Sequence, residues 1–251
     1  SASEDKRYIN RSRDNAVHQG LSLLQSMLYH SQEITTHYWL TPFLYFIHKH
    51  AHTVRGGGGE IERYYGFLCH LDNQLLGEVT DASLVVRSRR FMDDPWRTAS
   101  ALQFEAVLTE DHGVRFAHYW FYKLDFVLWY EQQPDHEFWG NFRFTAKNSV
   151  EHISPQTPQA IDTNTVSRDW LDRFGNLALV SRSINSEYGN LPYNEKRQRF
   201  LNKRAYEKRP DSLKMDLIYS KETWGEVAAD AHQAAMLAAL QCHYQRVFTI
   251  D

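Results

Sequence analysis

Apolar residues recur at helical spacing along the first half of the chain. Four of them between positions 17 and 28 follow one another at steps of four, three and four residues, which predicts an amphipathic helix over residues 14–31. Residues 36–50 are apolar on nearly all sides and contain Pro42. We therefore expect a buried helix there, with the proline in its first turn, where it costs no helical hydrogen bond.

Helical spacing continues over residues 60–76, 97–109 and 115–131. The last of these segments is too apolar to be exposed, so we expect it at the centre of a domain. A run of four glycines, Gly56–Gly59, predicts a flexible linker, natural or engineered, because glycine leaves the backbone unrestrained. We interpret residues 1–135 as a helical bundle that supports the rest of the chain.

The pattern changes in the second half. Residues 142–153 are rich in β-branched and aromatic residues and lack a helical stripe, which predicts one strand or a strand pair. Residues 177–180 predict another short strand, and a basic helix-rich segment over 181–205 and a terminal helix over 222–242 follow. We interpret residues 136–251 as a second domain. The apolar residues that share one face of the terminal helix are Trp224, Val227, Ala228, Ala231, Ala235 and Ala238.

Composition narrows the class of protein without identifying it. Of the 251 residues, 42% are hydrophobic and 24% are charged, as in folded globular proteins. Cys69 and Cys242 are too few for a disulfide framework or a cysteine zinc site. The chain contains no stretch of about 18 uncharged apolar residues, so we expect no membrane span and a cytoplasmic protein. The net charge of −3 excludes no partner, since a local basic patch suffices to bind nucleic acid.

Candidate chemistry begins where Glu151 and His152 stand side by side near the end of a predicted strand. A carboxylate oxygen suits a hard cation such as Mg²⁺, and an imidazole suits a general base. An asparagine from a following helix could complete a small metal site. Phosphodiester hydrolysis needs these groups, an activated water and a cation that neutralises the phosphate. On these two residues alone, the alternative is an ordinary Glu–His pair near a strand end.

An ordered set of short motifs favours the catalytic interpretation of Glu151 and His152 over an ordinary Glu–His pair. This set resembles the C-terminal nuclease domain of GmrSD-type restriction endonucleases, and more broadly the HNH branch of the His-Me finger (ββα-metal) nucleases. The close resemblance covers residues 142–205. The segments that carry it are Glu151-His152-Ile153-Ser154-Pro155-Gln156, Gly175-Asn176-Leu177-Ala178-Leu179-Val180, Ser181 to Asn185, and Lys196.

The resemblance implies a mainly α protein with a small ββα-metal core, of α+β class. It implies that His152 is the general base and that Asn176 holds its ring in orientation. Glu151 and Asn185 would bind the metal, and Lys196 would lie near the substrate phosphate. The family often has Asp where this chain has Glu151, and often His where it has Asn185. This weaker ligand set favours Mg²⁺ or Mn²⁺ over tightly held Zn²⁺.

Local charge supports a nucleic-acid substrate. Between Arg182 and Arg209 the chain has eight Lys or Arg against three Glu, a net charge of +5. Such a patch is expected to bind the phosphate backbone of DNA without reading its sequence; a solvated charged surface is the alternative. The residues expected to contact DNA are Arg182, Lys196, Arg197, Lys203 and Arg204.

We therefore predict a metal-dependent DNA endonuclease that nicks or cleaves as the effector of a restriction or anti-phage system, GmrSD-like or SspE-like. The resemblance also implies a nucleotide-dependent sensor domain as partner. Its Asp-Gly-Gln-Gln-Arg type motif is absent from this chain. Two alternatives stay open. One is a nucleic-acid-binding or regulatory module with a degenerate finger, and the other is an RNA-cleaving toxin with the same chemistry.

Overall fold

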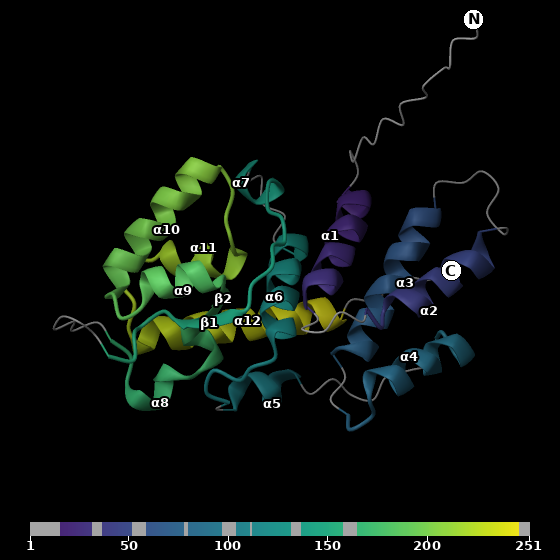
Figure 1. Cartoon of the computed structure of the whole chain (residues 1–251), viewed down its shortest axis with the longest axis horizontal. Helices are drawn as coiled ribbons and strands as arrows, with labels where there is room; N and C mark the ends of the chain where they lie inside the picture. Colours follow the sequence, from purple (N-terminus) through teal and green to yellow (C-terminus); the bar gives the residue numbers. More distant parts are fainter. Residues whose placement is uncertain are drawn as a thin grey trace, which may run out of the picture.

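The computed structural model is mainly helical, with one two-stranded antiparallel sheet among the residues that it describes (Figure 1). Of the predicted features, residues 97–103 and most of the glycine run fall outside the described part of the chain. The described residues are 16–31, 37–51, 59–77, 80–96, 104–110, 112–131, 137–157 and 165–245.

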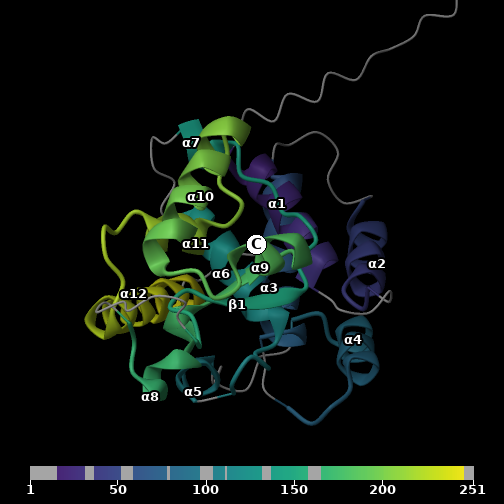
Figure 2. The same ribbon diagram turned by 60° about the vertical axis from the view of Figure 1, so that its left-hand side comes forward.

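The first helices confirm the predicted helical spacing. Pro42 is the third residue of its helix and is buried, as expected for the first turn. Helices α2 and α4 pack against each other on the side of the molecule away from α10 (Figure 2). The bounds of these elements are α1 Ala16–Ser31, α2 Leu40–His50, α3 Glu60–Leu75, α4 Leu84–Asp93 and α5 Phe104–Thr109.

Helix α6 (His118–Glu131) is central, as its apolar sequence predicts. Every side chain from Tyr119 to Trp129 is buried, and the helix packs against α1, α11, α12 and strand β2. The helix also contains a fully buried lysine, Lys123. Its Nζ lies 2.5 Å from Asp72 Oδ2 on α3. Asn73 Oδ1 accepts a second hydrogen bond from Lys123, and Tyr119 donates to Asp72. Pairing of this kind is what makes a fully buried lysine tolerable.

The second half begins with short elements and ends with longer helices. Strand β1 pairs antiparallel with β2, in the register Ser149 to Val180 and His152 to Leu177. The predicted strand over 177–180 is confirmed, whereas only the end of 142–153 is a strand. The bounds are α7 Glu137–Gly140, β1 Ser149–His152, α8 Arg168–Leu171, η1 Phe174–Asn176, β2 Leu177–Val180, α9 Arg182–Tyr188, α10 Tyr193–Glu207, α11 Leu213–Tyr219 and α12 Glu226–Gln245.

The small sheet lies between two hydrophobic clusters. Leu177 and Leu179 belong to the cluster that contains α6, whereas Ala178 and Val180 belong to a second cluster under α10 and α11. This division follows from the alternation of side chains along a strand. The first cluster contains residues from both sides of position 135, so α6 and the sheet share one core. The predicted division into domains 1–135 and 136–251 stays a prediction.

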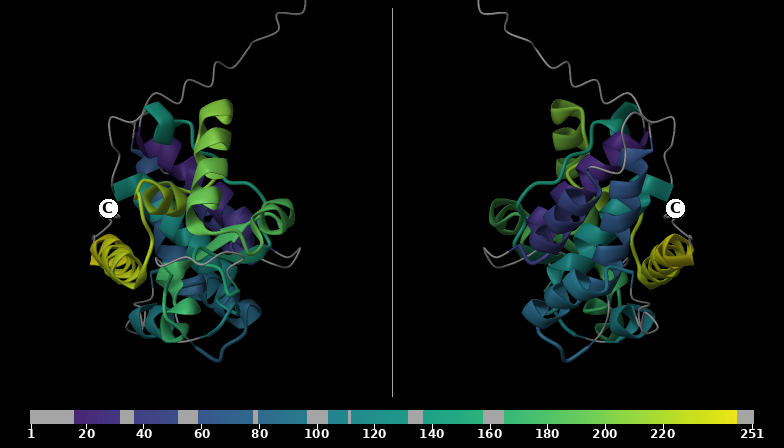
Figure 3. Two further views of the ribbon diagram at one scale, coloured as in Figure 1. Left: turned by 90° about the vertical axis from the view of Figure 1, so that its left-hand side faces the viewer. Right: turned by 90° about the vertical axis from the view of Figure 1, so that its right-hand side faces the viewer.

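Helix α12 runs along an outer edge of the molecule (Figure 3). Its buried residues are Ala229, His232, Gln233, Met236, Leu240 and His243. The predicted apolar face points mostly outward, and Val227 is 86% exposed. Alanine tolerates this orientation because it favours helix and exposes little apolar surface. Across the described residues, no helix is long and apolar enough to cross a membrane.

The orientation of α12 depends on Gly175. An added Cβ at this position would lie 2.6 Å from the Ala229 carbonyl oxygen and 2.9 Å from Gln233 Cβ. The Gly175 N–H also donates to Gln233 Oε1 at 2.9 Å. Helix α12 therefore packs directly on the backbone of η1, and only glycine permits this close approach.

We expect Gly175→Ala to destabilise the fold by about 1–3 kcal/mol, because the new methyl group meets backbone that cannot move independently. Thermal or urea unfolding measures this change. Gly140→Ala is the matched control, since a Cβ there meets nothing within 4 Å. Equal stability of the two variants would contradict the proposed close contact.

Candidate functional site

The predicted base is at the C-terminal end of β1. His152 is the last residue of that strand and is 9% exposed. Its Nε2 lies 2.6 Å from Asp172 Oδ1, just after α8. The Gln156 amide nitrogen lies farther from the same ring atom, at 3.4 Å. The principal partner of the imidazole is thus a carboxylate that the motif analysis did not include.

Asn176 is fully buried and joins three segments. Its Oδ1 accepts from the Ser154 N–H at 2.9 Å and from Trp224 Nε1 at 3.0 Å. Its Nδ2 donates to the carbonyls of Leu171 at 2.8 Å and Ser154 at 3.4 Å. These four bonds use the two donors and two acceptor positions of the amide. Asn176 therefore fixes the turn after His152. These four bonds do not include the ring, so the predicted orientation of His152 by Asn176 would act through this turn and stays a prediction.

Glu151 and Lys196 form a buried ion pair. Lys196 Nζ donates to Glu151 Oε1 and to the His152 carbonyl, each at 2.6 Å. Burial raises the pKa of Glu151, and the nearby ammonium opposes this shift. Burial lowers the pKa of Lys196, and the carboxylate opposes that shift. Because Lys196 has no exposed surface, this geometry disagrees with its predicted contact to a DNA phosphate.

The same pair bears on the predicted metal. Glu151 already faces a cation at Oε1, so a divalent ion at its carboxylate would have to share it with Lys196 or displace Lys196. Asn185 is half-buried on α9, which packs against β1. In the described part of the chain, no group of three or more His, Cys, Asp or Glu could hold a metal. The predicted ligands Glu151 and Asn185 are therefore not part of such a group, and their binding of Mg²⁺ or Mn²⁺ stays a prediction.

The local order of elements is two antiparallel strands and then a helix. Strands β1 and β2 are followed directly by α9, which packs against β1. Ser181 begins this helix, and its hydroxyl accepts a hydrogen bond from the Ile184 N–H. The motif residues of β1, η1 and α9 thus lie on one small unit.

Much of the predicted basic patch is paired within the fold. Arg197 Nε donates to the Tyr219 carbonyl at 2.9 Å. Arg204 Nε lies 2.5 Å from Asp216 Oδ1. Lys203 Nζ lies 3.8 Å from Asp211 Oδ1 and 3.9 Å from Glu207 Oε1. Arg182, by contrast, is exposed at the start of α9. Two of these acids, Asp211 and Asp216, lie beyond the segment whose charge was counted, so the patch has less free positive charge than its sequence indicates.

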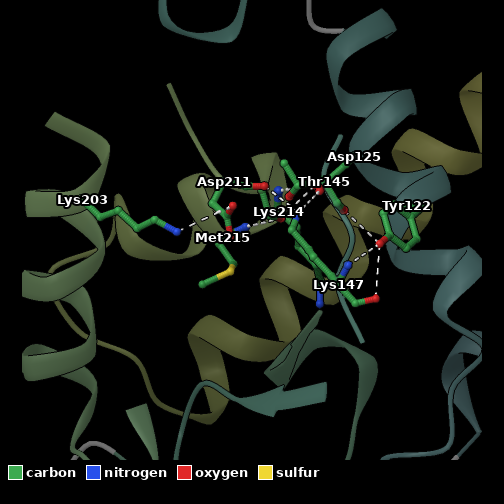
Figure 4. A network of polar contacts seen from close by, with 9 residues as sticks. Tyr122, Asp125, Thr145, Lys147, Lys203, Asp211, Lys214 and Met215 are labelled. Carbon is green, nitrogen blue, oxygen red and sulfur yellow. Dashed lines mark hydrogen bonds and ion pairs between the residues drawn. The ribbon is translucent and has the colours of Figure 1, made fainter. Parts of the chain in front are cut away.

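A second buried lysine supports the motif loop from below. Lys214 Nζ donates to the carbonyl oxygens of Phe174, at 2.5 Å, and Leu177, which flank Gly175 and Asn176. Its backbone N–H donates to Asp125 Oδ1 at 2.8 Å (Figure 4). Burial lowers the pKa of Lys214 to about 7, and Asp125 opposes this shift. Sequence spacing could not predict this contact, because Lys214 lies 40 residues beyond Phe174 on another element, α11.

Residues 105–239 match the profile of a protein family described as GmrSD restriction endonucleases, C-terminal domain. The match spans more than half of the 251 residues and includes every site residue discussed above. It confirms the family that the motifs indicate. Searches among curated proteins and among solved structures gave no match.

We expect Lys196→Met to destabilise the protein by about 3–5 kcal/mol, because it leaves the Glu151 carboxylate buried without a cation. The double variant Lys196→Met/Glu151→Gln should recover part of this loss, since it removes both charges. Urea unfolding measures both. Lys203→Met on the same helix is the control, and its partly exposed pairs predict a change of about 1 kcal/mol or less. A Lys196→Met protein as stable as the wild type would contradict the ion pair.

Lys214 predicts a specific dependence of stability on pH. Its pKa is about 7 in the fold against an ordinary value of 10.5, so the unfolded chain binds more protons between these values. Its contribution to stability therefore rises as pH increases from about 7 towards 10.5. We expect Lys214→Met to remove this rise, which is at most about 1.4 kcal/mol per pH unit. Urea midpoints of both proteins at several pH values test this, and identical slopes would contradict a neutral Lys214.

Proposed function

The chain belongs to the family of GmrSD restriction endonuclease C-terminal domains, and from this premise we propose that it hydrolyses phosphodiester bonds in DNA with His152 as general base. The observation that carries this proposal is the position of His152. It ends β1 within the family-matched segment, it is anchored to a carboxylate, and part of its surface is exposed. A general base needs this combination of a fixed ring and access to a water molecule.

The proposed step is direct hydrolysis. His152 accepts a proton from water, and the resulting hydroxide attacks phosphorus in line. The bond from phosphorus to the leaving 3′ oxygen breaks, and that oxygen receives its proton from solvent. The order β1, β2 and α9 supports our proposal that the site is a His-Me finger.

Cation dependence is part of the proposal, but no step is assigned to a metal. The predicted ligands are Glu151 and Asn185, and the first of them is held by Lys196. We propose that Mg²⁺ or Mn²⁺ supports cleavage only if the cation can compete with this ammonium. The supporting argument is chemical, since a phosphodiester requires charge neutralisation in the transition state.

For the DNA phosphates we propose Arg182 as the first contact. It is exposed at the N-terminal end of α9, which follows the sheet directly. Arg197, Lys203 and Arg204 would join it only after exchanging their present partners. Positive side chains of this kind bind the backbone and do not select sequence.

We further propose that the domain acts as the nuclease effector of a restriction or anti-phage system. The description of its family supports this role. The predicted nucleotide-dependent sensor domain would then control cleavage from outside the described site. Localisation in the cytoplasm, where foreign DNA is met, completes this proposal.

One observation favours a second candidate. The Glu151–Lys196 pair neutralises the carboxylate that the finger would use for a cation. A module of this kind could bind nucleic acid without cleaving it. It would show salt-dependent binding, since phosphate contacts release counterions, but no metal-dependent nicking.

A nicking assay on supercoiled plasmid tests the proposal. We expect His152→Ala to lose cleavage by about 10²–10⁴-fold, the range of a general base, while its thermal unfolding stays close to that of the wild type. Mg²⁺, Mn²⁺ and EDTA form the three arms, with single-stranded RNA tested in parallel. His48→Ala is the control, because His48 is an exposed histidine on α2.

Near-normal cleavage by His152→Ala would refute the assignment of the base. Salt-dependent DNA binding by a folded wild type that never nicks would instead support the second candidate. Cleavage of RNA in preference to plasmid would identify the substrate as RNA.

A further inference from the structure

Asp172 makes the shorter of the two polar contacts described above for the His152 ring, although it belongs to none of the motifs. Its Oδ1 lies 2.6 Å from His152 Nε2. The side chains of His152 and Asp172 are 11% and 33% exposed, so the pair is partly screened from water. Charge-assisted hydrogen bonds of this length are among the stronger ones in proteins.

The backbone around Asp172 is fixed on both sides. The preceding carbonyl, of Leu171, accepts from Asn176 Nδ2 at 2.8 Å. The following residue, Arg173, donates from its guanidinium to the Thr109 carbonyl and from Nε to the Asp169 carbonyl. The carboxylate is therefore presented from a short turn whose two neighbours are tied down. Such support is what holds a functional side chain in one geometry.

Asn176 acts on the same pair from a distance. It binds the backbone next to Asp172 through Leu171, and it binds the turn after His152 through Ser154. One buried amide thus sets the separation between the carboxylate and the imidazole. This explains how Asn176 can matter to the base although its own side chain is fully engaged elsewhere.

The hydrogen bond decides which ring nitrogen is basic. A carboxylate accepts hydrogen bonds and does not donate them, so Nε2 must carry the proton. Nδ1 then keeps its lone pair, and this nitrogen can accept a proton from water. The Gln156 amide nitrogen is a donor at 3.4 Å from Nε2. It cannot bond to a protonated Nε2, and the contact to Asp172 is shorter by 0.8 Å.

We propose that Asp172 is the positioning residue that keeps His152 in its Nε2–H tautomer and stabilises the imidazolium formed when water gives up its proton to Nδ1. The catalytic part of this inference rests on the proposed function. The tautomer part does not, because it follows from the His152–Asp172 contact alone. In the reaction the carboxylate stays ionised, and no proton passes to it.

Three variants separate these parts. Asp172→Asn keeps the size of the side chain but removes the charge, and its amide can donate to Nε2, which favours the Nδ1–H tautomer. Asp172→Glu restores a carboxylate. Asp169→Asn is the matched control, since it makes the same change in charge on an exposed residue of α8.

Long-range ¹H–¹⁵N spectra of the full chain report the tautomer of each imidazole, and the signal of His152 is the one missing from His152→Ala. We expect Nε2–H in the wild type and in Asp169→Asn, loss of this form in Asp172→Asn, and its return in Asp172→Glu. An unchanged tautomer in Asp172→Asn would overturn the inference. This readout does not depend on any activity.

Plasmid nicking tests the catalytic part. We expect Asp172→Asn to lower kcat by about 100-fold or more with little change in KM or in the unfolding temperature. Asp172→Glu should recover part of kcat. Full activity of Asp172→Asn would overturn the role in catalysis. If the folded wild type cleaves nothing, the nuclease proposal fails, whereas the spectra still decide whether Asp172 sets the ring.

Discussion

The site depends on one buried amide. Asn176 is withdrawn completely from water, and a buried polar group is stable only when its hydrogen bonds are made. Its four bonds reach Ser154, Leu171 and Trp224. These residues come from the turn after β1, the end of α8 and the segment before α12. The position of His152, that of its carboxylate partner and the entry into α12 are therefore set together.

Buried lysines extend the same constraint into the surrounding helices. Lys123, Lys196 and Lys214 are all fully or almost fully buried, and each finds its oxygen partners on another element. Lys123 and Lys196 form ion pairs, whereas Lys214 donates to backbone carbonyls. Buried ion pairs contribute little net stability, because removing the charges from water costs about as much as pairing them returns. The three lysine contacts instead fix the positions of the helices relative to one another. A helix that slid or turned would leave a buried ammonium or amine without its oxygen partners, so α3, α10 and α11 are fixed relative to α6 and the sheet.

This arrangement has a direct consequence for chemistry. Family membership indicates a nuclease domain, and the proposed base, His152, is held by the carboxylate of Asp172. The carboxylate next to the base faces inward to Lys196 instead of outward to a cation. Glu151 and His152, which the motif places side by side, point to opposite faces of β1 because side chains alternate along a strand. Whether a divalent cation binds at Glu151 therefore depends on its competition with Lys196.

The sequence by itself determined the helical spacing, the short strand at 177–180, the family, and the placement of Glu151, His152, Asn176 and Asn185 on one small unit. These features are local, since periodicity and ordered motifs act within a few turns of chain.

Tertiary structure alone decided the partners of the site residues. Asp172 is twenty residues from His152, Lys196 forty-five from Glu151, and Lys214 forty from Phe174. Nor could the alanines of α12 reveal which face is buried, because that depends on the close approach to Gly175. Charge counted along a segment likewise omits the acids that folding brings to it, as Asp211 and Asp216 do for α10. Pairing of buried polar groups is a property of the folded chain, so no local pattern encodes it.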